Sequence, residues 1–102
     1  MVVKQAAALI SVAEHALRIA ANNPRIADRF FNSVEHTLHL LEHNPQVGTL
    51  FRTDHPELQG IRKLRVAGFP RHLIFYQPIK GGIRFIKLLH TSRNIPKALQ
   101  EE

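Results

Sequence analysis

Cysteine and tryptophan are absent from this chain of 102 residues. Without cysteine the chain has no disulfide bond, no thiolate nucleophile and no cysteine-type zinc site, which fits a reducing compartment. No apolar run approaches the roughly 20 residues that a membrane-spanning helix requires. The apolar start of the chain is interrupted by Glu14, His15 and Arg18, unlike a secretory signal peptide. We therefore expect a cytoplasmic protein without a membrane partner.

Acidic residues are also absent from a long stretch, from Leu58 to Gln100. Residues 1–60 hold five Lys or Arg and six Asp or Glu, whereas residues 61–102 hold nine and two. The first half is therefore almost neutral, and the second half has a formal charge of +7. Such a field attracts phosphate and carboxylate groups, so the charge distribution predicts an anionic partner.

The length and an apolar content of 44% predict one globular domain over residues 1–102. Helical periodicity predicts two helices in the first half. Asn23 is the expected N-cap of the second helix and Pro24 its first residue, and this helix should end before Asn44. The first helix is expected to bury Ala6, Leu9, Ile10, Ala13, Ala16, Leu17 and Ala20, and to expose Ser11, Glu14, His15 and Arg18. The second helix is expected to bury Ala27, Phe30, Phe31, Val34, Leu38 and Leu41.

In the second half the pattern changes to the alternation that is typical of β-strands. We expect strands at residues 61–67, 71–77 and 83–90, turns at 68–70 and 81–82, a loop at 46–60, a short first strand at 2–5 and one or two helical turns within 94–102. The predicted fold class is α+β, with an N-terminal helical hairpin packed on a C-terminal three- to four-stranded antiparallel sheet. Because the strand at 71–77 is apolar on both faces, one face should pack on the hairpin and the other should receive a partner.

Three histidines, His36, His39 and His43, recur on one face of the second predicted helix. Imidazole nitrogens in such a row could bind a transition metal. However, no HExxH signature accompanies the row, and it lies opposite the apolar positions Val34 and Leu38. We interpret the row as a solvent-exposed face, and we predict no metal site and no cofactor.

Known catalytic signatures are also missing, because the sequence has no GxSxG elbow, no Walker loop and no GxGxxG motif. The remaining candidate is the basic surface of the predicted strands. This surface could be a solvated cationic face, bind phosphate groups, dock an acidic protein, or cleave RNA without a metal. In metal-free cleavage a base takes the 2′-hydroxyl proton, an acid protonates the leaving oxygen and arginines stabilise the phosphate.

Two overlapping sets of residues follow from these alternatives. The candidate catalytic residues are Arg65, Arg71, His72, Arg84, His90 and Arg93. The candidate residues for binding a partner or target are Arg62, Lys63, Arg65, Arg71, Tyr76, Arg84, Lys87 and Arg93. The sequence leaves open whether the protein is an enzyme.

Two segments resemble a known family. NPRIADRFFNSVEHTLHLLEHNPQVG, from Asn23, and FPRHLIFYQPIKGGIRFIKLLHTSRNI, from Phe69, resemble the RelE/ParE superfamily of toxins from type II toxin–antitoxin modules. The resemblance runs from about Ala8 to Ile95 and is closest to the ParE, or plasmid-stabilisation, branch. The most specific pieces are the Asn-Pro start of the second helix, residues 45–48, residues 71–76, and the Leu-His-x-x-Arg pattern within residues 88–95.

The resemblance implies a helical hairpin on an antiparallel sheet and an antitoxin encoded next door. The antitoxin's C-terminal segment would wrap over the toxin's groove and sheet, and the free toxin would stop growth. For ParE-like members the implied target is DNA gyrase, which is poisoned without the toxin being an enzyme. For RelE-like members the implied activity is ribosome-dependent cleavage of mRNA by a cluster of Lys, Arg and Tyr.

Two departures from the family pattern bear on this choice. The family opens with a full strand before the first helix, and here only Met1 to Gln5 is available for it. Active RelE-like nucleases have a late tyrosine, whereas no aromatic residue follows Phe85. We therefore predict a ParE-like gyrase inhibitor that is neutralised by a cognate antitoxin. The alternatives are a RelE-like mRNA interferase and a degenerate antitoxin-binding module without toxicity, and a homodimer is compatible with each.

Overall fold

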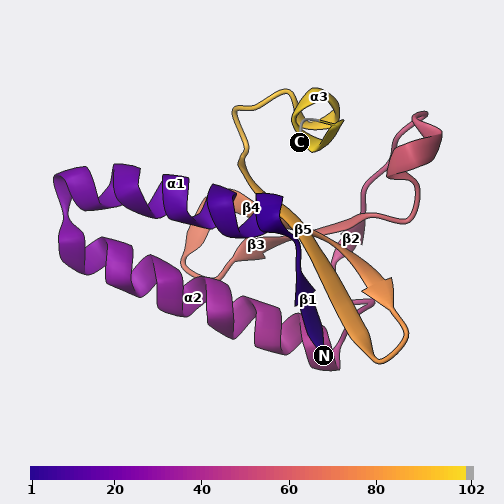
Figure 1. The fold of residues 1–102 in the computed structure, drawn as a ribbon, viewed down its shortest axis with the longest axis horizontal. Helices are drawn as coiled ribbons and strands as arrows, with labels where there is room; N and C mark the ends of the chain where they lie inside the picture. The colour runs from indigo at the N-terminus through magenta and orange to yellow at the C-terminus, as the bar shows by residue number, and fades with distance from the viewer. Residues whose placement is uncertain (101–102) are drawn as a thin grey trace.

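Two helices form a hairpin at the start of the chain in the computed structural model, which describes residues 1–100 (Figure 1). Helix α1 spans Ala6–Asn22 and helix α2 spans Pro24–His43. As predicted, Asn23 caps α2, because its side-chain oxygen accepts hydrogen bonds from the backbone N–H groups of Arg25 and Ile26. No described helix is both long enough and apolar enough to cross a membrane.

The face that α1 buries differs from the predicted one. Its buried residues are Ala8, Ser11, Val12 and Ala16. Leu9, Ile10 and Leu17, predicted to be buried, are 52%, 59% and 71% exposed. The reason is the hydroxyl of Ser11, which accepts a hydrogen bond from the N–H of Leu88 at 3.0 Å and donates one to the carbonyl of Ala8. Turning Ser11 inward satisfies a buried strand N–H, and it rotates the larger apolar side chains outward.

Five strands form one mixed sheet in the order β1-β5-β4-β3-β2. They are β1 (Val2–Lys4), β2 (Thr49–Leu50), β3 (Arg62–Val66), β4 (Phe69–Ile79) and β5 (Gly82–His90). The α+β class is therefore confirmed, but the sheet is not purely antiparallel, since β1 pairs parallel with β5. The predicted loop at 46–60 contains β2 and the short 3-10 helix η1 (Pro56–Leu58).

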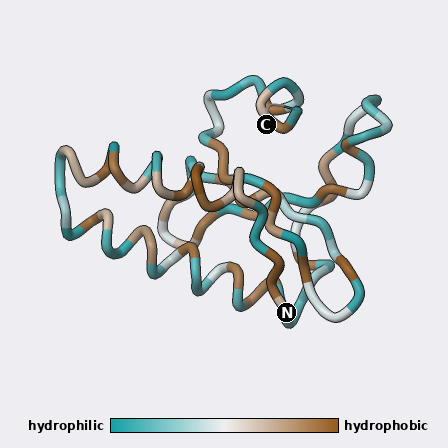
Figure 2. The backbone as a smooth tube through the Cα atoms, viewed as in Figure 1, coloured by the Kyte–Doolittle hydropathy of each residue, from teal (hydrophilic) through white to brown (hydrophobic). Residues whose placement is uncertain are grey.

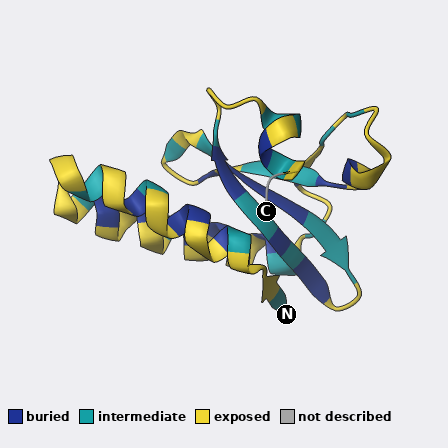
Figure 3. Ribbon diagram, turned by 45° about the horizontal axis from the view of Figure 1, so that its top comes forward, coloured by how far each residue is buried: buried dark blue, intermediate teal, exposed yellow. Residues whose placement is uncertain are grey.

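The sheet lies between two apolar cores. On one face the hairpin contributes Phe30, Val34, Leu38 and Leu41, which pack with Ile74, Tyr76, Phe85 and Leu88. On the other face lie Leu58, Ile61, Leu73, Phe75, Leu89 and Ala98. Figure 2 shows hydrophobic segments along the strands of the sheet. Figure 3 shows that the side of the hairpin turned to the solvent consists mostly of exposed residues.

The second face, which was expected to receive a partner, is covered in part by the chain itself. Helix α3 (Ile95–Gln100) buries Ala98 against this face, and Leu58 of η1 joins the same core. The Nζ of Lys87 donates a hydrogen bond to the carbonyl of Ala98 at 3.0 Å, which ties α3 to β5. What remains open on this face is the part nearer β3.

Candidate functional site

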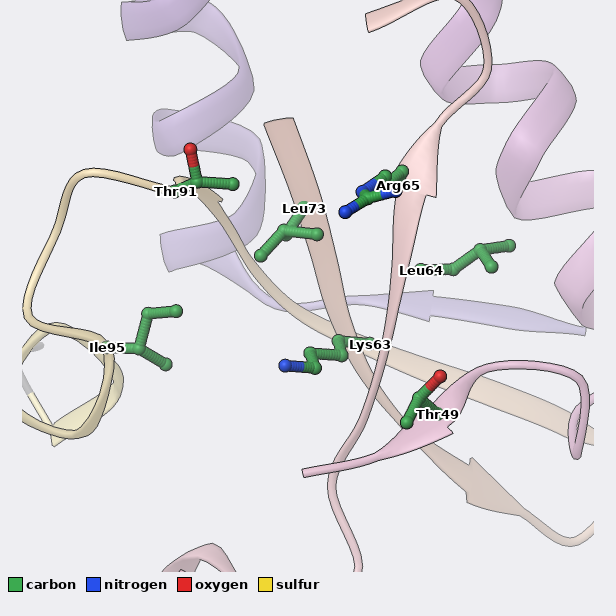
Figure 4. Close-up of a pocket in the computed structure, with 7 residues that line it drawn as sticks. All are labelled: Thr49, Lys63, Leu64, Arg65, Leu73, Thr91 and Ile95. Carbon is green, nitrogen blue, oxygen red and sulfur yellow. The ribbon is translucent and has the colours of Figure 1, made fainter. Parts of the chain in front are cut away.

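A basic pocket of about 540 Å³ opens on the α3 side of the sheet (Figure 4). It is lined by Thr49, Lys63, Leu64, Arg65, Leu73, Thr91 and Ile95. Lys63 and Arg65 alternate along β3, so they share a face, and they pair with Phe75 and Leu73 of β4. Figure 4 shows both side chains pointing to the side of Ile95, whereas Leu64 points the opposite way.

The positive charge of this pocket is not neutralised within the described part of the chain. No ion pair there involves Lys63 or Arg65, and no lining residue is acidic. The Nζ of Lys63 lies 6.0 Å from the centre of the Phe51 ring, a cation–π contact that leaves the charge in place. Strand β2 pairs with β3 at Arg62 and Lys63, so the β3 edge from Leu64 to Val66 has no neighbouring described strand.

The other predicted binding residues are placed differently. Tyr76 is fully buried, and its hydroxyl donates to the carbonyl of Pro45 at 2.7 Å and accepts from the N–H of Gly48 at 2.9 Å. Tyr76, which the sequence suggested as a binding residue, therefore has no accessible side-chain surface in this structure. Arg62 donates to the carbonyl of Gly48 at 2.7 Å, which holds the connection after α2 against the sheet. Arg84 donates to the side chain of Gln77.

A cluster of histidines forms where α1 crosses the end of the sheet. The ring of His72 lies 5.2 Å from that of His15, 5.4 Å from that of His90 and 5.0 Å from that of Phe30. Burial, together with the neighbouring His15, His90 and Arg18, lowers the pKa of His72 to about 4. Burial, followed by the charge of Arg18, also lowers the pKa of His15. His72 is therefore neutral at pH 7.

The six candidate catalytic residues are not gathered at one point. His72 and His90 are register partners on neighbouring strands, and Arg93 follows β5 in the same region. Arg84 lies six residues before His90 on β5, roughly 20 Å away at the spacing of a strand. Arg65 lines the basic pocket on the opposite face, and Arg71 is exposed near the start of β4. Sequence reasoning missed His15 and Arg18. His15, predicted to be exposed, is half-buried beside His72, and no local pattern indicates that Arg18 lies near the same ring.

The histidine cluster predicts acid-sensitive stability. The pKa of His72 is about 4 in the folded protein, against 6.5 for an ordinary histidine. Between these values the unfolded chain binds a proton that the folded chain does not, so the free energy of unfolding should fall as pH drops from 6.5 toward 4. We expect a loss on the order of 1 to 3 kcal/mol, measured by urea unfolding at a series of pH values.

The matched variant for this test is His72→Phe, which keeps an aromatic ring beside Phe30 and removes the titrating group. Its stability should depend less on pH over the same interval. Some dependence should persist, because His15 shifts in the same direction. A variant whose pH profile superimposes on that of the wild type would show that His72 does not cause the acid sensitivity.

An apolar groove lies between α1 and α2, close to the connection that joins the two helices. The hairpin projects beyond the sheet in this region (Figure 1). It is lined by Ala13, Ala16, Leu17, Ala20, Pro24, Ala27, Asp28 and Phe31 and has a volume of about 390 Å³. Leu17 is 71% exposed and Phe31 is 44% exposed. Phe31 was predicted to be buried, and the two side chains instead flank a floor of small residues. Contiguous exposed apolar surface of this kind is typical of interaction sites, so the groove is a second candidate site.

Comparison with known proteins places the chain in a family. A search of curated proteins finds no match to it. The family model that matches describes the ParE toxin of type II toxin–antitoxin systems (parDE), and it covers residues 5–95. This range contains the hairpin and strands β2 to β5, and therefore the basic pocket and the apolar groove. The chain thus belongs to the ParE toxin family of type II toxin–antitoxin systems.

Proposed function

We propose that the free protein acts in the cytoplasm as an inhibitor of DNA gyrase and that a cognate antitoxin, encoded by an adjacent gene, neutralises it. The observation that carries the antitoxin part is the pair of open surfaces on one small domain. Among the described residues, Lys63 and Arg65 of the basic pocket have no acidic partner, and the groove presents Leu17 and Phe31. A disordered segment with acidic and apolar residues could cover both surfaces as it folds.

If the antitoxin contacts the groove, a charged residue placed at the edge of the groove should weaken its binding. Replacing Leu17 by aspartate should weaken antitoxin binding by roughly 10- to 100-fold, because a carboxylate would be buried against apolar residues in the complex. Folding should be little affected, since Leu17 is 71% exposed. The binding constant can be measured by calorimetry. His36→Asp is the control, because His36 is exposed on α2 but does not line the groove.

Co-purification tests the antitoxin interaction most simply. The chain is co-expressed with the product of the adjacent gene, and a stable complex at micromolar concentration is expected. If the two proteins stay separate at that concentration, the proposed neutralisation is wrong. Induction of the chain alone should arrest growth, and co-induction of the neighbour should restore it. Unimpaired growth on induction alone would instead favour a binding module without toxicity.

One observation favours a second candidate function, cleavage of mRNA on the ribosome. His72 is neutral at pH 7 and the ring of His90 lies 5.4 Å away, so two imidazoles, the usual groups of proton transfer, stand side by side. Arg93 follows on the same segment. Codon-positioned cuts, seen by primer extension on translating ribosomes, would support this function. His72→Phe should then abolish the cuts, whereas it should leave gyrase inhibition intact.

A further inference from the structure

Two histidines and a glutamate meet at the C-terminal end of α2. His39, Glu42 and His43 each offer one possible ligand atom, and these three atoms lie within 4.8 Å of one another. The two imidazole rings are 4.6 Å apart, and Nδ1 of His39 is 3.8 Å from Oε1 of Glu42. His36, the first histidine of the row on this helix, does not belong to the group.

From the sequence, the histidine row is interpreted as a solvent-exposed face without a metal, because the row alone shows no carboxylate ligand. From the structure we propose instead that His39, Glu42 and His43 bind a divalent transition-metal ion and that zinc matches this ligand set best. Imidazole nitrogen and carboxylate oxygen bind zinc at about 2.0–2.2 Å, which places neighbouring ligand atoms of a tetrahedral site about 3.4 Å apart. The observed 3.8 Å between His39 and Glu42 needs only a small side-chain rotation to reach this value. Magnesium and calcium prefer oxygen ligands alone and fit this set poorly.

The spacing of the three residues supports the proposal. They form the pattern H-x-x-E-H over residues 39–43, so the two histidines are four positions apart on one side of the helix. Helical zinc sites use histidine pairs at this separation. This arrangement does not match the HExxH pattern, in which the glutamate directly follows the first histidine. Here the glutamate directly precedes the second histidine.

Two features of the surroundings favour a bound cation, and one opposes it. Nδ1 of His43 lies 3.0 Å from the carbonyl oxygen of His39, to which it donates, and this leaves the lone pair of Nε2 for the metal. Helix α2 ends at His43, where its last carbonyl groups carry a partial negative charge. Lys4, which shares a hollow with His39 and Glu42, is paired with Glu35 at 2.7 Å. The metal must compete with the Met1 amino group, which pairs with Glu42.

Exposure of the site sets the expected affinity. The side chains of His39 and His43 are 73% and 62% exposed, so water completes the coordination and holding both rings costs side-chain entropy. We therefore expect micromolar affinity, weaker than that of an enclosed structural zinc site.

Calorimetric titration of the untagged protein with zinc chloride tests the proposal. One ion should bind per chain, and His39→Ala and His43→Ala should each weaken binding by at least about tenfold. His36→Ala is the matched control, since it removes a histidine from the same helix and should leave the affinity unchanged. Circular dichroism shows that each variant is folded. Full zinc affinity in the double variant of His39 and His43 would overturn the proposal, as would loss of binding in His36→Ala or no binding to the wild type.

Discussion

Replacing Gly48 by alanine is expected to destabilise the protein by about 3 kcal/mol. A Cβ at this position would lie 2.7 Å from Cε1 of Tyr76 and 2.9 Å from the carbonyl oxygen of Lys63, and the Tyr76 hydroxyl is closer still. Tyr76 is fully buried and Lys63 is held in β3, so neither can move away freely. Thermal unfolding should show a midpoint lowered by roughly 15 °C.

Two companion variants make the cause of this loss testable. Gly68→Ala should cost only about 1 kcal/mol, because no described atom beyond the adjacent residues lies within 4 Å of the added Cβ and the penalty comes from the positive φ of 79°. Tyr76→Phe removes the hydroxyl and leaves the carbonyl of Pro45 and the N–H of Gly48 without their partner. Combined with Gly48→Ala it should cost less than the sum of the single changes, since the nearest obstruction is gone. Strict additivity would contradict the steric explanation.

Reversing both charges of the basic pocket should have the largest effect on binding. The double variant Lys63→Glu/Arg65→Glu is expected to weaken antitoxin binding by about 3 kcal/mol, roughly a 100-fold rise in Kd. Both side chains line the pocket and neither has an acidic partner among the described residues, so they are available to a carboxylate-rich segment. Calorimetry at two salt concentrations measures the change, and added salt should weaken the wild type more than the variant.

A control variant with the same change in net charge distinguishes the effect of this pocket from the effect of the protein's overall positive charge. Arg29→Glu/Lys80→Glu changes the net charge by the same amount at two exposed positions, one on α2 and one in the turn between β4 and β5. It should raise Kd only a few-fold, through a slower association rate. Equal losses in the two double variants would mean that the whole cationic half attracts the antitoxin and that the pocket has no special role.

The sequence predicts the hairpin well because the signals that limit α2 are local. Asn23 and Pro24 act within one turn of the chain, and the structure has both in their expected positions. The rotation of α1 is not local, because it depends on a hydrogen bond between Ser11 and Leu88, which are 77 positions apart. Because α1 is rich in alanine, its apolar residues do not define one face strongly. Periodicity alone therefore predicted the wrong face of this helix to be buried.

The basic residues of β3 were predicted from the sequence, but the face of the sheet on which each one lies was not. Alternation along β3 separates Arg62 from Lys63 and Arg65, and nothing in the sequence says which of them faces the pocket. Arg62 instead holds the backbone near Gly48, and Tyr76 supports the same connection from the core. The parallel pairing of β1 could not be predicted from local patterns either. Its three residues are too few to show a clear alternation, and its direction is defined only by its pairing with β5.

The free toxin is expected to inhibit DNA gyrase, and a supercoiling assay tests this expectation most directly. Purified gyrase, ATP and relaxed plasmid are incubated with increasing amounts of the protein, with and without its antitoxin. We predict a dose-dependent loss of supercoiling that the antitoxin reverses. Undiminished supercoiling at a protein concentration that arrests growth would contradict this account.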